Sequence, residues 1–254
     1  MSPAGDSVAI TRTGRRLDIV LNRPERANAL APQMVETMLS ALEEAAGDDQ
    51  VRLCTLRGEG RHFCAGFDLS DLADLSDGDL LWRLVRIETL LQRVHSAPFP
   101  VLALAHGKAV GAGADLFVAS SWRTAAPGTQ FRFPGLNFDI ALGTRRLAAA
   151  IGTAAARDCL IDIQTISSQA GVQLGLVHNE QAQSEWPAAM ERMEERATVL
   201  SADTARRVLR LTSSADDAAD LAALVQSACR PGLRHRIERY ANASRHVGNT
   251  QNAQ

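Results

Sequence analysis

Two glycine-framed segments constrain this chain more than any other feature of its sequence. The first spans residues 61–69 (RHFCAGFDL) and the second residues 106–116 (HGKAVGAGADL). In each segment an apolar run is followed by a tight glycine turn and then by residues that can form a helix. Unpaired backbone N–H groups at such turns point outward and favour a negative charge. Together the segments therefore predict the two halves of an oxyanion hole.

Strand-like and helical patterns alternate over the first part of the chain. A hairpin of two short strands is followed twice by a helix with regularly spaced apolar residues and then by an apolar strand. This repeated step predicts an α/β body. The predicted elements are strands 8–11 and 17–21, helix 32–46, strand 51–56, helix 80–94 and strand 101–104.

The strand signals end after the middle of the chain, and helical patterns take over. We therefore expect an α/β domain of residues 1–185 and a helical region of residues 186–254 that caps it and mediates oligomerisation. The later predicted elements are strands 122–125 and 130–133, helices starting near Gly143 and Thr153, and helices 167–174, 186–200, 202–211, 216–229 and 233–243. The polar residues 248–254 are expected to fray.

The bulk composition argues against several classes of function. With 254 residues and 46% hydrophobic content, the chain can bury one sizeable core. A formal net charge of −2 gives no general attraction to nucleic acid or to anionic membranes. No apolar run approaches the roughly 20 residues needed to cross a bilayer. We expect a soluble cytoplasmic protein that binds neither nucleic acid nor membrane.

Other kinds of site find little support in the sequence. The cysteines lack any Cys-x-x-Cys spacing and are interpreted as reduced thiols, so neither a disulfide nor a metal site is expected. A Gly-x-Ser-x-Gly nucleophile elbow is missing. Residues 111–113 lack the third glycine of a dinucleotide-binding turn. The four cysteines are Cys54, Cys64, Cys159 and Cys229.

Two backbone amides are the candidate donors of the oxyanion hole. Phe67 follows the Gly66 turn, and Ala112 begins the helical stretch after Gly111. Small residues beside both amides let a ligand carbonyl approach the main chain closely. The alternative, that residues 111–113 only ease helix packing, stays open for either segment taken alone.

Five segments in one order make the chain resemble the crotonase family, the enoyl-CoA hydratase/isomerase group. Their order and spacing match over roughly residues 8–180, whereas the helical C-terminal part resembles the family only in character. The segments are residues 23–30 (RPERANAL), 63–69 (FCAGFDL), 107–116 (GKAVGAGADL), 142–147 (LGTRRL) with Ile151-Gly152, and 170–177 (AGVQLGLV).

The resemblance implies a fold, a ligand and an assembly. The expected fold is the ClpP/crotonase-like spiral of ββα turns with a C-terminal helical subdomain. The expected ligand is an acyl-CoA thioester, with coenzyme A as part of the substrate and with no separate cofactor or metal. The expected assembly is a homotrimer or a dimer of trimers.

The resemblance also assigns residues. Main-chain groups around Arg26, Ala27, Ala29 and Ala65 would hold the adenine and pantetheine, while the Phe67 and Ala112 amides would receive the thioester oxygen and stabilise an enolate. The implied substrate-binding set is Arg26, Ala27, Ala29, Ala65, Gly66, Asp68, Leu69, Val110, Gly111, Pro134 and Gly135.

The acid/base groups depart from the family pattern. Family hydratases use two glutamates, at the positions that Asp115 and Gly135 occupy here. Aspartate reaches less far, and glycine has no carboxyl group, so ordinary hydratase activity is not assumed. An isomerase moves a single proton and suits one carboxyl group better, yet known isomerases keep the acid at the position of Gly135. Asp115 is the best acid/base candidate, against the alternative of a helix-end cap or ion pair.

Several further residues have two interpretations. Asp139 could replace the missing acid, although a solvated or capping role is favoured. Asp68 could accept backbone N–H bonds or pair with an arginine, and a structural role is favoured over chemistry. Phe67 either narrows the acyl pocket or packs in the core. His62, His106 and Cys64 are weak catalytic candidates. Arginines at 230, 234, 236 and 239 could reach CoA phosphates, but a solvated helix face is the commoner explanation.

Two alternatives to an enoyl-CoA hydratase or isomerase stay open. A CoA-thioester-binding homologue without catalysis would combine intact oxyanion turns with an incomplete acid pair. A thioester hydrolase or decarboxylase would use the same two amides to stabilise a different anion.

Overall fold

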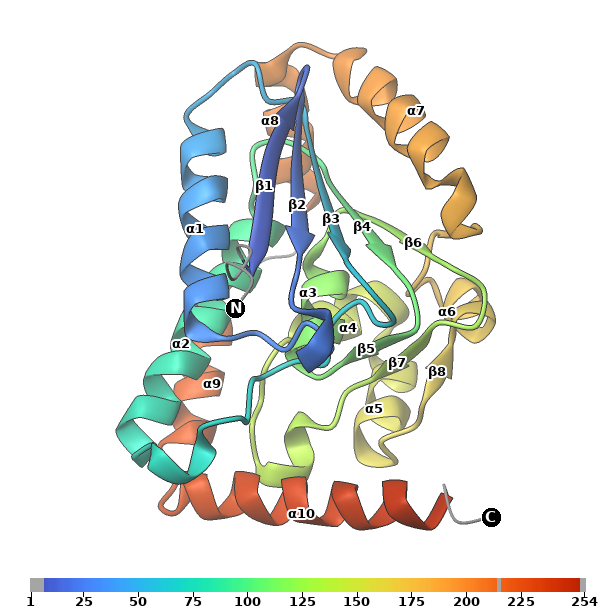
Figure 1. Ribbon diagram of the computed structural model, residues 1–254. Coiled ribbons are helices and arrows are strands. Elements are labelled where there is room, and N and C mark those ends of the chain that lie inside the picture. Colours follow the sequence, from blue (N-terminus) through green and yellow to red (C-terminus); the bar gives the residue numbers. More distant parts are fainter. Residues whose placement is uncertain (1–6, 214–215, 252–254) are drawn as a thin grey trace, which may run out of the picture.

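The computed structural model describes residues 7–213 and 216–251, with side chains described up to residue 243. Two β-sheets and a surrounding set of helices build the molecule (Figure 1). The larger sheet has the strand order β1-β2-β3-β4-β6-β9, and the smaller one has the order β5-β7-β8. The strands are β1 (Val8–Thr13), β2 (Arg16–Leu21), β3 (Leu53–Gly58), β4 (Val101–Ala105), β5 (Lys108–Val110), β6 (Trp122–Ala125), β7 (Gln130–Arg132), β8 (Ile166–Ser167) and β9 (Asn179–Glu180).

The larger sheet begins with a hairpin and continues as a parallel sheet. Strands β1 and β2 pair antiparallel across the turn at Gly14, which has a φ of +60°. Strands β2, β3, β4, β6 and β9 are all parallel, so each connection must cross over through other elements. The carboxyl ends of these strands therefore gather at one edge, from which the glycine-framed segments depart.

Helices fill the crossovers and the C-terminal part. The predicted helix over residues 32–46 is present with those bounds, and a Ser76–Asp79 capping box begins the second helix three residues before the predicted start. The helices are α1 (Pro32–Ala46), α2 (Asp77–His95), α3 (Ala112–Ala119), α4 (Thr144–Ile151), α5 (Thr153–Ile161), α6 (Ser168–Leu174), α7 (Trp186–Thr198), α8 (Ala202–Thr212), α9 (Asp217–Ala228) and α10 (Leu233–Gln251). Short 3₁₀ turns are η1 (Pro24–Arg26), η2 (Leu72–Asp74), η3 (Gly135–Phe138) and η4 (Gln183–Glu185).

Both faces of the larger sheet are buried at β4, in its centre. On β4, Leu102 and Leu104 face α7, whereas Val101 and Ala103 face the main core with α1 and α2. This alternation follows from the two-residue period of a strand, and burial on both faces explains why β4 is apolar throughout.

The C-terminal helices pack directly on the α/β body. Leu224 of α9 and Ile237 of α10 share a buried apolar cluster with Leu80 and Leu84 of α2 and with Ile140. Figure 1 shows α10 running along the end of the molecule beside η3, opposite the hairpin turn. The division at residue 185 stays a prediction, and the C-terminal helices contribute to the packing of the first part.

Several predicted boundaries need correction. Strand β3 begins at Leu53 rather than at residue 51, and α10 continues to Gln251 instead of ending at residue 243. The prediction that the last residues fray is therefore wrong for residues 248–251, and residues 252–254 lie outside the described part. The sequence analysis also missed β5, β8 and β9, because strands of two or three residues are too short to display a period.

Candidate active site

Backbone pairing brings the two glycine-framed segments side by side. The Phe63 amide donates to the His106 carbonyl at 2.9 Å, and the Val110 amide donates to the Cys64 carbonyl at 3.0 Å. Cys64 and Ala109 form a parallel bridge between these bonds. Segments that lie some forty residues apart in the sequence therefore leave the sheet edge together.

Gly66, which directly precedes Phe67, lies against the segment that carries the second candidate amide. A Cβ atom built on Gly66 would lie 2.5 Å from the Val110 carbonyl oxygen and 3.2 Å from the Ala112 nitrogen. With a φ of +91°, residue 66 has a conformation that glycine adopts readily. Among the described residues, neither the Phe67 amide nor the Ala112 amide has a hydrogen-bond acceptor. Ala112 is the first residue of α3, where unpaired donors are normal.

A cavity of about 100 Å³ joins most of the predicted residues. Its wall includes both candidate amide residues and the candidate acid. Most of its lining is apolar, and Asp115 is the only carboxyl-bearing residue among the described residues that line it. The predicted residues in the wall are Ala65, Phe67, Leu69, Val110, Gly111, Ala112, Asp115, Pro134 and Gly135.

The remaining predicted residues lie outside this wall. Arg26 is exposed, and Ala27 and Ala29 belong to a loop that contacts the first glycine segment through the Ala65 amide, which donates to the Ala27 carbonyl at 2.9 Å. Gly66 directly precedes Phe67 and contacts the second glycine-framed segment. Asp68 is buried and pairs with Arg23, and the hydrogen bonds from Arg23 and Ser70 lower its pKa although burial opposes them.

The loop at residues 26–29 has an unusual backbone. Ala27 and Asn28 have φ values of +50° and +55°, a region that side-chain-bearing residues seldom adopt. The side-chain amide of the buried Asn28 holds the loop in this conformation. Its Nδ2 donates hydrogen bonds to the Glu59 and His62 carbonyls at 2.9 and 2.8 Å. Such strain is kept where the surrounding structure demands it, often at ligand sites.

Sequence reasoning missed six residues of the cavity wall. They come from α2, from the segment around η3 and from α10, which are distant in sequence from the glycine segments. The Phe138 and Tyr240 rings contact each other with centroids 4.9 Å apart. Leu84, Ile237 and Tyr240 fall within predicted helices, but no local signal pointed to a cavity. The missed residues are Leu84, Phe138, Ile140, Leu142, Ile237 and Tyr240.

Asp115 is a buried carboxyl group in an apolar setting. A Cβ atom built on Gly143 would lie 2.2 Å from Asp115 Oδ1, so the carboxyl group rests against the glycine that begins α4. It accepts no hydrogen bond from the described residues. Burial raises the pKa of Asp115 well above its ordinary value, Arg146 partly opposes this, and Glu88 adds to it. Burial therefore makes this carboxyl group easier to protonate than an exposed one, a property common in groups that transfer protons.

The position of the second family acid is sterically closed. A Cβ atom built on Gly135 would lie 2.8 Å from the Ile140 carbonyl oxygen. Any side chain there would require the segment to shift. The local backbone therefore leaves no space for a carboxyl-bearing side chain at residue 135.

The other acid and nucleophile candidates lie elsewhere. Asp139 does not line the cavity and pairs with Arg230 and Arg236 at 3.4 and 3.9 Å. Burial raises the pKa of the Cys64 thiol to about 12, which leaves it protonated and unreactive. His106 is buried and contacts the Gly60 carbonyl through Nε2 at 2.8 Å, outside the cavity wall.

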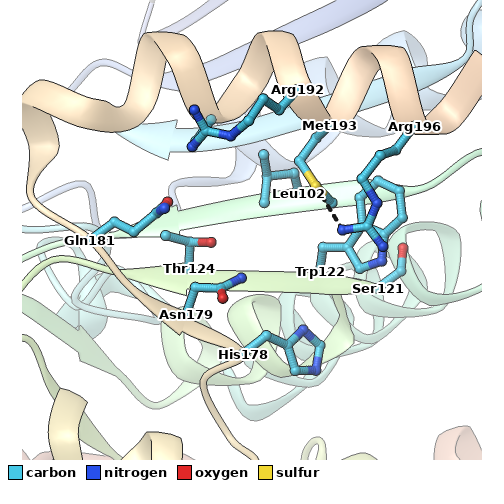
Figure 2. A pocket seen from close by; sticks show the side chains of 11 residues that line it. Leu102, Ser121, Trp122, Thr124, His178, Asn179, Gln181, Arg192, Met193 and Arg196 are labelled. Atoms are coloured by element: carbon cyan, nitrogen blue, oxygen red, sulfur yellow. Dashed lines mark hydrogen bonds between the residues drawn. The ribbon is translucent and has the colours of Figure 1, made fainter.

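A larger cavity of about 580 Å³ lies between α7 and strands β6 and β9. Figure 2 shows Arg192 and Arg196 above it, with Thr124, Asn179 and Gln181 below. The Arg196 guanidinium lies 5.3 Å from the centre of the Trp122 ring. None of the predicted site residues lines this cavity, so its size does not identify the candidate active site.

Comparisons with known proteins agree with this site. A model of the enoyl-CoA hydratase/isomerase family matches residues 16–230. The chain belongs to this family, whose fold is the crotonase fold. A putative enoyl-CoA hydratase/isomerase from Bordetella parapertussis has 42% sequence identity and a TM-score of 0.91, covering 92% of this chain and 98% of that one.

Curated relatives agree with the family match. A probable enoyl-CoA hydratase of Mycobacterium tuberculosis is 33% identical over 209 residues, covering 80% of this chain and 82% of the relative. A probable enoyl-CoA hydratase of Bacillus subtilis is 36% identical over 157 residues, covering 59% of this chain and 60% of the relative.

Family membership confirms the predicted spiral α/β fold and the coarse function. This crotonase-type protein is an acyl-CoA-processing enzyme of the hydratase/isomerase type, and its substrate is a CoA thioester. Across the described residues, no helix is long and apolar enough to span a bilayer.

Proposed function

We propose that the Phe67 and Ala112 amides bind the thioester carbonyl oxygen of an acyl-CoA substrate. The close approach of Gly66 to the Ala112 nitrogen, the absence of an acceptor for either amide among the described residues, and the place of Phe67 and Ala112 in one cavity wall support this role. Two such donors stabilise the negative charge that develops when the substrate becomes an enolate. The strained loop at residues 26–29 and the adjacent Ala65 would hold the coenzyme A part.

We further propose that the chemistry is a single-proton shift, as in enoyl-CoA isomerisation. The observation that carries this proposal is that Asp115 is the only carboxyl group in the described cavity wall. The Asp115 carboxylate would take a proton from the α-carbon of a 3-enoyl-CoA, and the electron pair would pass into the conjugated thioester enolate. Asp115 would return the proton to the γ-carbon, which yields the 2-enoyl-CoA with atoms and charge balanced.

Hydration suits this cavity less well. Adding water to a 2-enoyl-CoA requires one group to activate the water and another to deliver a proton to the α-carbon. The position of the second acid is Gly135, and the Ile140 carbonyl blocks a side chain there. A single group that alternates between base and acid needs no second carboxylate.

The test compares Asp115→Asn with the wild-type enzyme on short 3-enoyl-CoA and 2-enoyl-CoA thioesters. Absorbance follows the conjugated product, and mass spectrometry separates isomerisation from hydration because only hydration adds a water. Wild type should isomerise, and D115N should lose about 10³-fold in kcat while binding the thioester nearly as well. The matched control Asp139→Asn removes a carboxyl group outside the cavity and should keep full activity.

Each other result has a distinct meaning. Full turnover by D115N would contradict the role of Asp115, and a hydrated product from wild type would contradict the single-proton reaction. Thioester binding without turnover of either substrate would favour the non-catalytic interpretation.

We also infer that the enzyme works as a homotrimer or a dimer of trimers in the cytoplasm. Exposed apolar side chains on and just before α8 support association, since this helix buries none of its residues within the subunit. Free cysteines fit a reducing compartment. The assembly is tested by the surface variants described in the Discussion, and the location by cell fractionation.

A further inference from the structure

A buried cluster of charges lies among the helices behind the cavity. Arg146 of α4 contacts Glu88 of α2 through both terminal nitrogens, with Nη1 at 3.1 Å from Oε1. The same Nη1 lies 3.4 Å from Asp220 Oδ2 on α9. The Glu88 and Arg146 side chains are only 1% and 4% exposed. Removing a charged side chain from water costs free energy, so buried charges persist only next to close partners of opposite charge.

The backbone connects this cluster to Asp115. Asp115 rests against Gly143, and Arg146 follows three residues later in the first turn of α4. On α2, Leu84 lines the cavity, and Glu88 lies one turn further along the same face. The cluster and the cavity therefore share α2, and Gly143 at the N-terminal end of α4 connects Asp115 with Arg146 along the chain.

The cluster has more negative than positive groups. Two buried carboxyl groups, those of Glu88 and Asp220, contact the Arg146 guanidinium, and a third, that of the buried Asp115, lies against Gly143, three residues before Arg146. The Arg146 Nε is buried and has no hydrogen-bond partner among the described residues. In an interior without water, it is energetically unfavourable for the three carboxyl groups and the guanidinium all to be charged at once.

Other titratable groups lie at the edge of the cluster. They lie on α2, α4, α9 and α10, the helices that surround Asp115 or line its cavity. Arg145, which is largely exposed, contacts Asp220 and Asp216 at 3.4 Å each. The remaining groups are His95 on α2, Asp217 on α9 and Tyr240 on α10.

We propose that Arg146 and Glu88 are positioning residues that control when Asp115 can accept a proton. Arg146 supplies the positive charge that allows the buried Asp115 to ionise, and Glu88 competes for that charge. The inference rests on the proposed role of Asp115 as the single proton carrier. It assigns a function to a charge cluster that touches neither the substrate nor the reacting atoms.

The direction of the effect follows from the charges. Burial raises the pKa of Asp115, Arg146 lowers it, and Glu88 raises it. Removing the negative charge of Glu88 therefore lowers the pKa of Asp115 and leaves Arg146 more available to it. Asp115 acts as a base in the proposed reaction, so its activity should persist to lower pH in such a variant.

The experiment measures kcat/KM against pH for wild type and for Glu88→Gln, which keeps the size and one hydrogen-bond acceptor of the side chain. On the acidic limb of the profile, E88Q should exceed wild type by roughly three- to tenfold. Glu36→Gln is the matched control, because Glu36 pairs with Arg86 on the surface. E36Q should leave the profile unchanged. An acidic limb that stays in place or moves to higher pH in E88Q would overturn the proposal.

A second measurement tests the inference even if E88Q loses activity or folds poorly. Carboxyl ¹³C NMR on the whole enzyme follows the titration of Asp115, assigned by its absence in D115N. Asp220→Asn, at the edge of the cluster, should move this titration to lower pH, in the same direction as E88Q but less far. An unmoved Asp115 titration in both variants refutes the inference. This readout needs no turnover, so it separates failure of the inference from failure of the proposed reaction.

Discussion

At the scale of single residues, the contact between Gly143 and Asp115 defines the geometry of the site. Gly143 has a φ of +65° and leaves no room for a Cβ atom beside the carboxyl group. It is the residue before α4, so its position is tied to a rigid element. We infer that this glycine directs the Asp115 carboxyl group towards the Phe67 and Ala112 amides.

Gly143→Ala should therefore impair catalysis more than stability. The new methyl group would push Asp115 from its place, and we expect kcat to fall about 100-fold, the usual cost of a misplacement near 1 Å. The left-handed backbone adds about 1–2 kcal/mol of destabilisation. Gly128→Ala is the matched control, because Gly128 has a φ of +79° with nothing within 4 Å of a built Cβ. Equal kcat losses in both variants would show that strain alone is responsible.

At the scale of elements, η3 and α10 form the far wall of the cavity. Phe138 and Tyr240 stack where these elements meet, and Ile237 lies one turn before Tyr240 on α10. Arg236 anchors α10 to this wall by donating to the Phe138 carbonyl at 3.1 Å. The space left for an acyl chain is small because two aromatic rings occupy it.

Tyr240→Ala should change the acyl-chain preference. Removing the ring enlarges the cavity, so kcat/KM for a long acyl thioester should rise about tenfold relative to a short one. The ratio is measured with a series of enoyl-CoA chain lengths. Trp82→Ala provides the control, since Trp82 is an exposed aromatic residue on α2 that does not line this cavity. An unchanged ratio in Y240A would place the acyl chain elsewhere.

At the scale of the whole molecule, α8 exposes more apolar surface than an isolated subunit needs. Its residue Leu211 is 74% exposed and Val208 is 45% exposed, and Val199 just before the helix is 79% exposed. Apolar side chains grouped in this way are typical of a surface that another subunit covers.

Leu211→Glu should weaken the proposed trimer. A charge placed in an apolar contact is costly to bury, so we expect at least about a tenfold rise in the dissociation constant of the assembly. Analytical ultracentrifugation over a concentration series measures this. Ile161→Glu is the control, because Ile161 on α5 is 73% exposed but lies outside the α8 surface. If I161E dissociates the assembly and L211E does not, the interface lies elsewhere.

Local sequence patterns were sufficient for the helices, the main strands and the two glycine turns. The apolar spacing along α1 arises between neighbours in the chain, so it is visible in a linear reading. The glycine at position 66 likewise reports a backbone requirement of its own turn. These features predicted an α/β body and the amide pair, whereas the crotonase fold was implied by the resemblance of five segments to the family.

The cavity wall and the charge cluster could be known only after folding. Tyr240 reaches Phe138 from about one hundred residues away, and Glu88 meets Arg146 across two helices. Neither contact can be predicted from the spacing of nearby residues, because both contacts depend on how whole helices pack against one another. The chain's own pattern thus predicted two amides for the substrate carbonyl, because each depends on its own turn, whereas helix packing determined the shape of the cavity and the electrostatic surroundings of Asp115.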